Sequence, residues 1–411
     1  MFDFANTPYV VIVATVGFST YFKDVVVHGA RSGDFLWGLA GSISMIFVAL
    51  TAPYLGAYAD AAAAKRRLLF IYTVLVVVAT ALLGTVKAGM VVWGMLLYIL
   101  ANIGFQGGQA FYNAFLPEVA RDEDLGAVSG LGSAAGYVGA LLSLFAALPF
   151  FWHGFEEGNL GNVRAMFVAA AVFFAIFSVP TFLLLRDAPR PRAALAASGL
   201  AGSLRRLRED VTDLRRNRAP FLFLVAYLLY MDAITTLTTF VGIYARQTLD
   251  LSLPQIFSLF IISQITAIPG SVILGRVADR HGAKPTISWL LVLWILLIVL
   301  GVVATGYREL VIMALLAGVA TGALFSVSRS MMALLSPKDR EGEFFGFYAV
   351  AGRISAIVGP VMFGAISSIS GNQRLALSSL LLIIVAGLLV LRRVPMDDVP
   401  ADRTDEEGAT A

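Results

Sequence analysis

Four amide side chains stand in one row within an apolar stretch of this chain. They are spaced at i, i+4, i+7 and i+11, which places them on one face of a helix: Asn102, Gln106, Gln109 and Asn113. Polar groups inside a membrane are costly unless they face protein or water. Amides donate and accept hydrogen bonds without a net charge, so the row would suit a pathway for a neutral polar or zwitterionic solute. The alternative is that the amides tie neighbouring helices together.

A carboxylate stands near the middle of a second apolar stretch. Asp232 lies about twelve residues into residues 220–245, and Thr235, Thr236 and Thr239 follow on its own face. The charged form is expensive there unless it is paired or hydrated, so gain and loss of a proton could be coupled to transport. We assign Asp232 to proton coupling, and Asp232 and Thr236 to the substrate pathway. The alternative is a structural carboxylate bonded to a neighbouring Asn or Arg.

Two arginines fall within apolar stretches of the second half of the chain. Arg329 and Arg353 lie toward the predicted cytoplasmic ends, within reach of water for long side chains. The internal repeat described below pairs Arg353 with Ser133, so Arg353 is specialised in one half. It would serve either a gate-side ion pair or an anionic group of the substrate.

The elements that carry these residues are membrane spans. The chain of 411 residues is 58% hydrophobic and 14% charged, with a mean hydropathy of +0.82, which only a polytopic membrane protein fits. Apolar runs of about 20 residues predict twelve helical spans. They cover residues 4–22, 35–58, 68–86, 90–114, 125–150, 164–185, 220–245, 255–277, 286–305, 310–333, 344–369 and 375–391.

The two halves of the chain repeat each other. Gly56, Asp60 and Lys65 recur 219 positions later as Gly275, Asp279 and Lys284. A second set recurs after 220 positions, with Pro117, Gly126, Gly132 and Gly139 matched by Pro337, Gly346, Gly352 and Gly359. Such symmetry is typical of transporters built from two like halves. We expect an N-terminal bundle over 1–185, a cytoplasmic basic linker over 186–219, a C-terminal bundle over 220–393 and a disordered acidic tail over 394–411.

The distribution of Lys and Arg predicts the orientation. Of the 30 Lys and Arg residues, 21 lie in segments on the same side as the termini, 7 lie on the other side and 2 lie within spans. Both termini are therefore expected on the cytoplasmic side, and we expect the membrane to be a bacterial-type inner membrane. The linker is either an amphipathic helix on the inner leaflet or a solvated tether. The sequence pI near 9.1 comes mostly from these inner segments and does not indicate nucleic-acid binding.

One loop motif carries a resemblance to a known superfamily. Gly275, Asp279, Arg280, Gly282 and Lys284 complete the pattern Gly-x-x-x-Asp-Arg-x-Gly-x-Lys, which resembles the loop signature of the major facilitator superfamily. Further segments are similar to the vacuolar amino-acid effluxer (autophagy-related) family and its bacterial relatives. They are residues 3–7, 112–117, 328–330, 343–348 and 352–353. The first loop copy departs from the pattern through a longer turn over 61–64, and the fifth span lacks a Gly-Pro step, which weakens an antiporter reading.

The resemblance implies an all-α membrane protein whose twelve helices form two pseudo-symmetric six-helix bundles, with the first, fourth, seventh and tenth helices around a central cavity. It also implies that Asp60 caps the helix start near 344–347 and Asp279 the one near 125–128, closing a cytoplasmic gate. We place Arg280, Arg329 and Arg353 in the same gate.

These features favour a secondary transporter of a small polar solute, by resemblance an amino acid or a related metabolite. Catalytic groups do not assemble at one depth, so we expect no enzyme. The chain has no Cys and only three His, so we expect neither a metal site nor a cofactor. The expected partners are a small-molecule substrate and the lipid bilayer, without nucleic acid, and we expect a monomer. The alternatives are a lipid, amphiphile or drug exporter, against which the amide row argues, and a non-transporting membrane scaffold.

Overall fold

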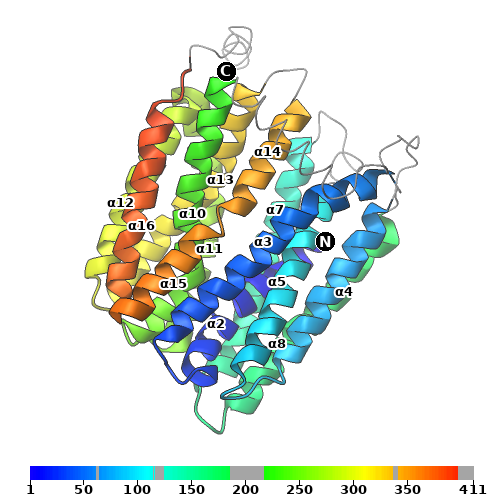
Figure 1. Cartoon of the computed structure of the whole chain (residues 1–411), viewed down its shortest axis with the longest axis vertical. Coiled ribbons are helices and arrows are strands. Elements are labelled where there is room, and N and C mark those ends of the chain that lie inside the picture. Colours follow the sequence, from blue (N-terminus) through cyan, green and yellow to red (C-terminus); the bar gives the residue numbers. More distant parts are fainter. Residues whose placement is uncertain (62–63, 114, 116–124, 186–216, 337–340, 397–411) are drawn as a thin grey trace. The chain divides into compact units, whose positions relative to one another are not determined.

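The computed structural model describes residues 1–411 except 62–63, 114, 116–124, 186–216, 337–340 and 397–411. Every regular element in the described part is a helix (Figure 1). The first half contains α1 (Phe2–Pro8), η1 (Tyr9–Thr15), α2 (Gly17–Tyr21), η2 (Phe22–Val26), α3 (Ser32–Ala61), α4 (Lys65–Leu83), α5 (Val91–Asn113), α7 (Leu125–Phe151) and α8 (Leu160–Leu184). The second half contains α10 (Arg218–Gln247), α11 (Leu253–His281), α12 (Ala283–Val303), α13 (Tyr307–Leu335), α14 (Glu341–Ile354), α15 (Val358–Ser370) and α16 (Gln373–Arg392).

The predicted spans fall on these helices. Eleven stretches of the described residues are long and apolar enough to cross a membrane, and α7 adds a shorter apolar stretch over Ala135–Phe151. The all-α class and the twelve predicted spans are therefore confirmed. Of the predicted linker and tail, residues 186–216 and 397–411 lie outside the described part of the chain.

The first span is not a regular α-helix. Its backbone widens to a π-helix at η1 and again at η2, with the Val16 N–H donating to the Val11 carbonyl, five residues back, at 3.0 Å. The Thr15 hydroxyl bonds the Val10 carbonyl at 2.8 Å, and a Cβ at Gly17 would collide with the Ile12 carbonyl oxygen. Short π-helical bulges of this kind occur frequently at functional sites.

The eleventh span is divided into two helices. Helix α14 ends at Ile354 and α15 begins at Val358, so the single helix predicted over 344–369 is wrong in this detail. The Gly359-Pro360 step gives the physical reason. Proline lacks an N–H, and its ring clashes with the carbonyl four residues back, which for Pro360 is that of Ala356 inside the break. The break leaves the first N–H groups of α15 without partners inside the helix.

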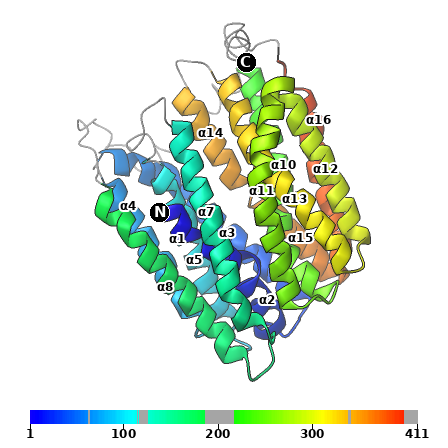
Figure 2. The same cartoon turned by 180° about the vertical axis from the view of Figure 1, so that it is seen from behind.

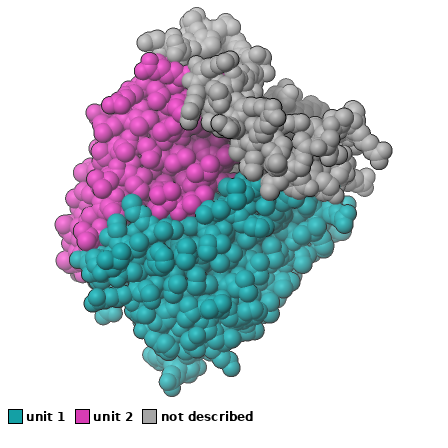
Figure 3. Space-filling view, in the orientation of Figure 1, with its two compact units in different colours: residues 1–205, 238–261, 360–373 teal, residues 206–237, 262–359, 374–411 magenta. Residues whose placement is uncertain are grey.

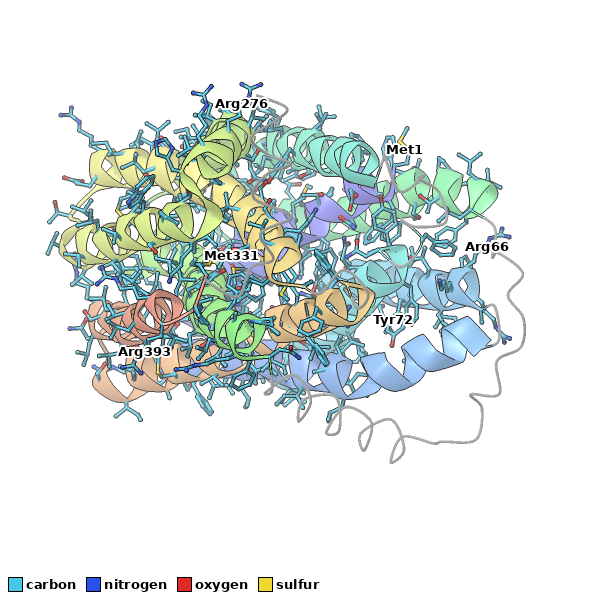
Figure 4. The ribbon with its side chains drawn as sticks, turned by 90° about the horizontal axis from the view of Figure 1, so that it is seen from above. Met1, Arg66, Tyr72, Arg276, Met331 and Arg393 are labelled. Atoms are coloured by element: carbon cyan, nitrogen blue, oxygen red, sulfur yellow. The ribbon has the colours of Figure 1, made fainter. Side chains whose placement is uncertain are left out.

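Glycines let neighbouring helices approach closely. Helix α4 packs against both α5 and α8 (Figures 1 and 2). A Cβ on Gly104 of α5 would lie 2.6 Å from the Val76 backbone nitrogen, and one on Gly107 would meet the ring of Tyr72, which Figure 4 labels on α4. Small residues at helix contacts are the usual means of tight packing in membranes, where the hydrophobic effect does not drive helices together.

The described chain forms two compact units, coloured separately in Figure 3. Unit 1 comprises residues 1–205, 238–261 and 360–373, and unit 2 comprises 206–237, 262–359 and 374–411. Helices α10, α11 and α15 each pass from one unit to the other. Unit 1 therefore contains the six spans of the first half and one end each of α10, α11 and α15. These are the ends that the distribution of Lys and Arg predicts to lie on the side of the membrane away from the cytoplasm.

A buried ion pair joins these segments inside unit 1. The Lys23 Nζ lies 2.7 Å from the Asp34 Oδ1, and the two side chains are 3% and 2% exposed. Lys23 also donates to the Ala30 carbonyl at 3.0 Å. The other oxygen of Asp34 accepts hydrogen bonds from Ser367, at the end of α15, and from Gln373 Nε2 at 2.9 Å. Both charges are thus paired and hydrogen-bonded, as burial requires.

A second ion pair nearby is more exposed. Arg246 Nε lies 3.1 Å from Asp24 Oδ2, and Gln247 donates to Asp24 Oδ1 at 3.0 Å. These side chains are 30% and 20% exposed, so solvent screens the pair and its contribution to stability is small. Together the two pairs connect the first and second spans with the seventh and eleventh.

We predict that Gly104→Ala lowers the melting temperature of the purified protein. Over-packing typically costs about 1–3 kcal/mol, which exceeds the gain of about 1 kcal/mol from replacing glycine in a helix. The matched control is Gly161→Ala in α8, where a new Cβ meets nothing within 4 Å. The control should melt no lower than the wild type. Equal melting temperatures for the two variants would contradict the close packing of α4 on α5.

The buried ion pair predicts a non-additive double-mutant cycle. Lys23→Met or Asp34→Leu alone strands a buried charge and should cost about 3–5 kcal/mol, whereas the double variant should lose much less than the sum. Asp24→Asn, which breaks the exposed pair, should cost about 0–1 kcal/mol. Thermal unfolding of the four proteins in detergent measures the cycle. Additive losses would mean that the Lys23 and Asp34 charges are independent.

Candidate functional site

The amide row lies along α5 and becomes more exposed toward the end of the helix. Asn102 is buried, Gln106 and Gln109 are half-buried, and Asn113 is exposed. The four side chains share a stripe, but the structure gives them different neighbours. The four residues therefore differ in the interactions they make.

Asn102 bonds to a neighbouring helix. Its Nδ2 donates to the Ser44 Oγ of α3 at 2.5 Å, and both side chains are buried. This contact is what the packing alternative expects of an amide in a span. At this position the amide connects α3 and α5.

Gln106 has different surroundings from Asn102. It is half-buried, and its amide forms no hydrogen bond with the residues that the structure describes. Its neighbour Phe105 stacks on Tyr9, with ring centroids 4.9 Å apart. A buried or half-buried amide without a protein partner retains its capacity to bond water or a solute.

Gln109 belongs to a network that connects α5 with α1. Its Oε1 accepts from the Asn6 Nδ2 at 2.8 Å, while its Nε2 lies 3.5 Å from both Asp3 Oδ1 and Asn113 Oδ1. The Tyr112 hydroxyl donates to Asp3 Oδ2 at 2.9 Å. Two members of the row, Gln109 and Asn113, are thus brought together with polar side chains of the first span.

The sequence analysis did not predict that Asp3 and Tyr112 belong to a polar network. A usable signal was present, because Asp3, Asn6 and Thr7 follow the i, i+3, i+4 spacing of one helix face. Tyr112, adjacent to Asn113, reaches the same carboxylate. Partners from two different helices cannot be paired from spacing alone.

Asp232 is buried in α10, and its partner is a backbone group. The Gly359 N–H donates to Asp232 Oδ1 at 2.9 Å, and the side chain is 3% exposed. Gly359 is the second residue of α15, so the carboxylate satisfies one of the amides freed by the break in the span. A Cβ at Gly359 would lie 2.9 Å from both carboxylate oxygens, so glycine is needed for this approach. The partner differs from the Asn or Arg side chain considered in the sequence analysis.

Thr236 stands beside this carboxylate. Its Oγ1 donates to the backbone carbonyl of Asp232 at 2.6 Å, a bond within α10 that leaves the carboxylate itself untouched. A Cβ on Gly359 would also collide with the Thr236 hydroxyl. Asp232, Thr236 and Gly359 therefore form one compact group in unit 2.

The same unit contains an aromatic and hydroxyl cluster that the sequence patterns missed. Tyr230 and Ser328 share a hydrogen bond of 2.8 Å, and the rings of Tyr227 and Tyr348 lie 4.2 Å apart. Figure 4 labels Met331, a buried residue that follows Ser328 by one turn of α13. The cluster joins α10, α13 and α14 near the position of Asp232 on α10.

The predicted gate residues are only partly described. The side chains of Asp60, at the end of α3, and Asp279, at the end of α11, lie outside the described part, as do those of the helix start at 125–128. Arg280 and Arg329 are exposed, and Arg353 is half-buried in the last turn of α14. Their assignment to a gate stays a prediction. In the described residues, no group of three or more His, Cys, Asp or Glu is placed to hold a metal ion.

Solved structures with a similar fold are transporters. A crystal structure of a mutant of the nucleoside transporter NupG matches with a TM-score of 0.73 at 15% identity, covering 96% of this chain and 97% of that one. The inward open form of the xylose transporter XylE from E. coli matches with a TM-score of 0.68 at 17% identity, covering 96% and 94%. These likenesses confirm the major facilitator fold.

Related sequences point to one branch of that fold. The uncharacterised MFS-type transporter YxiO of Bacillus subtilis (strain 168) is 27% identical over 98% of this chain and 96% of its own length. Autophagy-related protein 22 of Kluyveromyces lactis is 24% identical over 87% of this chain and 78% of its own. The family model "Vacuole effluxer Atg22 like" matches residues 37–126 and 123–402. The chain is therefore a major facilitator transporter that belongs to the Atg22-like vacuole effluxer family.

Proposed function

We propose that this protein moves a small polar solute, an amino acid or a related metabolite, across a bacterial plasma membrane by alternating access, with a proton as the coupling ion. Two six-helix bundles, 1–185 and 220–393, rock about a site within the membrane, and both termini face the cytoplasm. The observation that carries the proposal is the polar network of Gln109, Asn6 and Asp3 within otherwise apolar spans.

The substrate pathway follows the open part of the amide row. Gln106 has no hydrogen-bond partner among the described residues, Gln109 belongs to the network with Asn6 and Asp3, and Asn113 is exposed, whereas buried Asn102 bonds Ser44 of α3. Neutral donors and acceptors suit a solute that carries no net charge. An exporter of lipids or other amphiphiles would instead need an apolar lining, so the row favours the polar solute.

Asp232 supplies the titrating group of the proposed mechanism. A single backbone N–H compensates its charge in the residues described, so the charged form is only partly stabilised in a low-dielectric span. Protonation removes the charge and weakens the hold on the start of α15. Protonation is then coupled to helix movement through the break in the eleventh span, because α14 and α15 can pivot about residues 355–357.

The gates complete the proposed cycle. On the outer side, opening is accompanied by release of the hydrogen bonds that Ser367 and Gln373 donate to Asp34, the ion-pair partner of Lys23. On the cytoplasmic side, Asp60 and Asp279 cap helices of the opposite half, assisted by Arg280, Arg329 and Arg353. Carboxylates at helix starts contribute about 0.3–1 kcal/mol when exposed, enough to bias two nearly balanced states.

Gln106→Leu should abolish transport without loss of folded protein, because it removes a polar group that has no described protein partner. The matched control is Asn102→Leu, which breaks the bond to buried Ser44 and should lower the melting temperature and transport together. Uptake of labelled L-amino acids into liposomes, with thermal unfolding of the same samples, separates the two effects. Wild-type transport by Gln106→Leu would remove this residue from the pathway.

Asp232→Asn should separate exchange from proton-driven accumulation. Asparagine keeps an oxygen for the Gly359 N–H but stays neutral, so labelled solute should still exchange with unlabelled solute while uphill uptake fails. A pH-sensitive dye inside the liposomes reports the accompanying proton movement. If the variant retains substrate-dependent proton flux of normal size, Asp232 is a structural residue and another acid carries the proton.

A further inference from the structure

Asp3 turns its carboxylate away from the helix end on which it stands. It lies in the first turn of α1, where a negative charge interacts favourably with the free N–H groups of the helix start. No side-chain cap is formed there. Both oxygens point instead to α5, one to the Tyr112 hydroxyl at 2.9 Å and the other toward the Gln109 amide at 3.5 Å.

The charge of Asp3 has only neutral partners. Tyr112 and Gln109 are uncharged donors, and no Lys, Arg or His forms an ion pair with Asp3 in the described part of the chain. The residue is half-buried, so water screens its charge incompletely. A carboxylate in such surroundings is strongly stabilised by a cation.

The groups around Asp3 offer acceptors to an incoming ligand. A carboxylate accepts about four hydrogen bonds, and Asp3 receives two. The Asn6 Nδ2 donates to the Gln109 Oε1 at 2.8 Å, and the Gln109 Nε2 lies 3.5 Å from the Asn113 Oδ1 as well as from Asp3. The second lone pairs of the Asp3 oxygens and of the Asn113 amide oxygen remain available, and Asn113 is exposed. A ligand that fits carries several N–H donors and a positive charge.

The space beside Asp3 limits the size of the group it can hold. A Cβ on Gly132 of α7 would lie 2.8 Å from Asp3 Oδ2, and one on Gly136 would lie 3.4 Å from Asp3 Cβ. Helix α7 thus closes one side of the carboxylate, and Tyr112, on whose ring Phe2 stacks with centroids 4.8 Å apart, occupies another. A compact ammonium group meets these conditions better than a planar guanidinium.

We propose that Asp3 binds the ammonium group of the transported solute, and that Tyr112 is a positioning residue that holds the carboxylate toward α5. The inference rests on the proposed transport function and narrows its substrate to amines and zwitterions. Solutes whose ammonium group is replaced by a hydroxyl are excluded by the unpaired charge that they leave behind.

Binding of matched pairs of compounds tests this assignment. The probes are the L-amino acids and ethanolamine, each amino acid paired with its 2-hydroxy acid, titrated calorimetrically into the purified full chain. The wild type should bind at least one ammonium compound roughly 10-fold or more tightly than its hydroxyl partner. If none of the ammonium compounds binds, or the members of each pair bind equally, the proposal is wrong.

Variants then locate the effect. Asp3→Asn should weaken ammonium binding roughly 10- to 100-fold and leave 2-hydroxy acid affinity unchanged. Tyr112→Phe should weaken it several-fold, and Glu157→Gln, an exposed loop acid, should not change it. If Asp3→Asn does not fold, Asp3→Glu, which keeps the charge, should retain the preference for the ammonium partner and Tyr112→Phe should reduce it. Unchanged ammonium affinity in Asp3→Asn would overturn the proposal. It would also be overturned if the effect of Asp3→Asn were confined to Na⁺ binding, because Asp3 would then bind Na⁺ and not the ammonium group.

Transport by the same proteins distinguishes this failure from that of the proposed function. Solute movement by the wild type with unaltered ammonium preference in Asp3→Asn would leave the transport function intact and refute the Asp3 site. Loss of proton flux in Asp3→Asn at unchanged affinity would also refute it, because Asp3 would then be a proton carrier. Ammonium-selective binding that depends on Asp3, without any transport in liposomes, would refute the transport function and leave the site.

Discussion

The hydrocarbon interior of a membrane cannot hydrogen-bond, so every polar group inside it must find its partner within the protein. This constraint explains why the described chain is entirely helical and why the breaks in its helices are the informative places. Where Pro360 ends a helix prematurely, Asp232 satisfies the freed amide of Gly359. Where the first span enters the membrane, Asp3 is held by side chains of α5. The same constraint makes the buried ion pair of Lys23 and Asp34 a strong connection.

We propose that hydrogen-bond partners distinguish structural residues from residues of the substrate pathway along α5. Asn102 and Gln106 lie one turn apart on α5 and have the same chemistry, yet one bonds Ser44 and the other has no described partner. A protein that only needed its helices held together would gain nothing from an amide left open in a span, since an apolar side chain would cost less. Residues of the second kind are the ones that a passing solute can use. The same reasoning supports the proposal that Asp3, a carboxylate with neutral partners, binds a cation.

The sequence predicted the spans well because a span needs only a run of apolar residues of sufficient length. It also identified Asp232 and the amide row, since polar residues in such runs are conspicuous. The partners were beyond its reach: the Gly359 amide lies 127 positions from Asp232, and Tyr112 lies 109 from Asp3. Such contacts depend on the rotation and tilt of the helices. Packing between helices, at glycines such as Gly104, sets the rotation and tilt, and the local sequence does not reveal them. The division of the eleventh span shows the same limit, because its apolar run continues through residues 355–357.

Alternating access makes one demand that neither a channel nor a scaffold shares: substrate on one side must speed the movement of substrate from the other. The most direct measurement is therefore counterflow in liposomes that contain the purified wild-type protein. Liposomes loaded with an unlabelled L-amino acid that the protein binds should take up the labelled compound transiently above equilibrium, and liposomes without that load should not. Equal uptake with and without the internal solute, or no uptake in either case, would contradict a secondary transporter of this solute class.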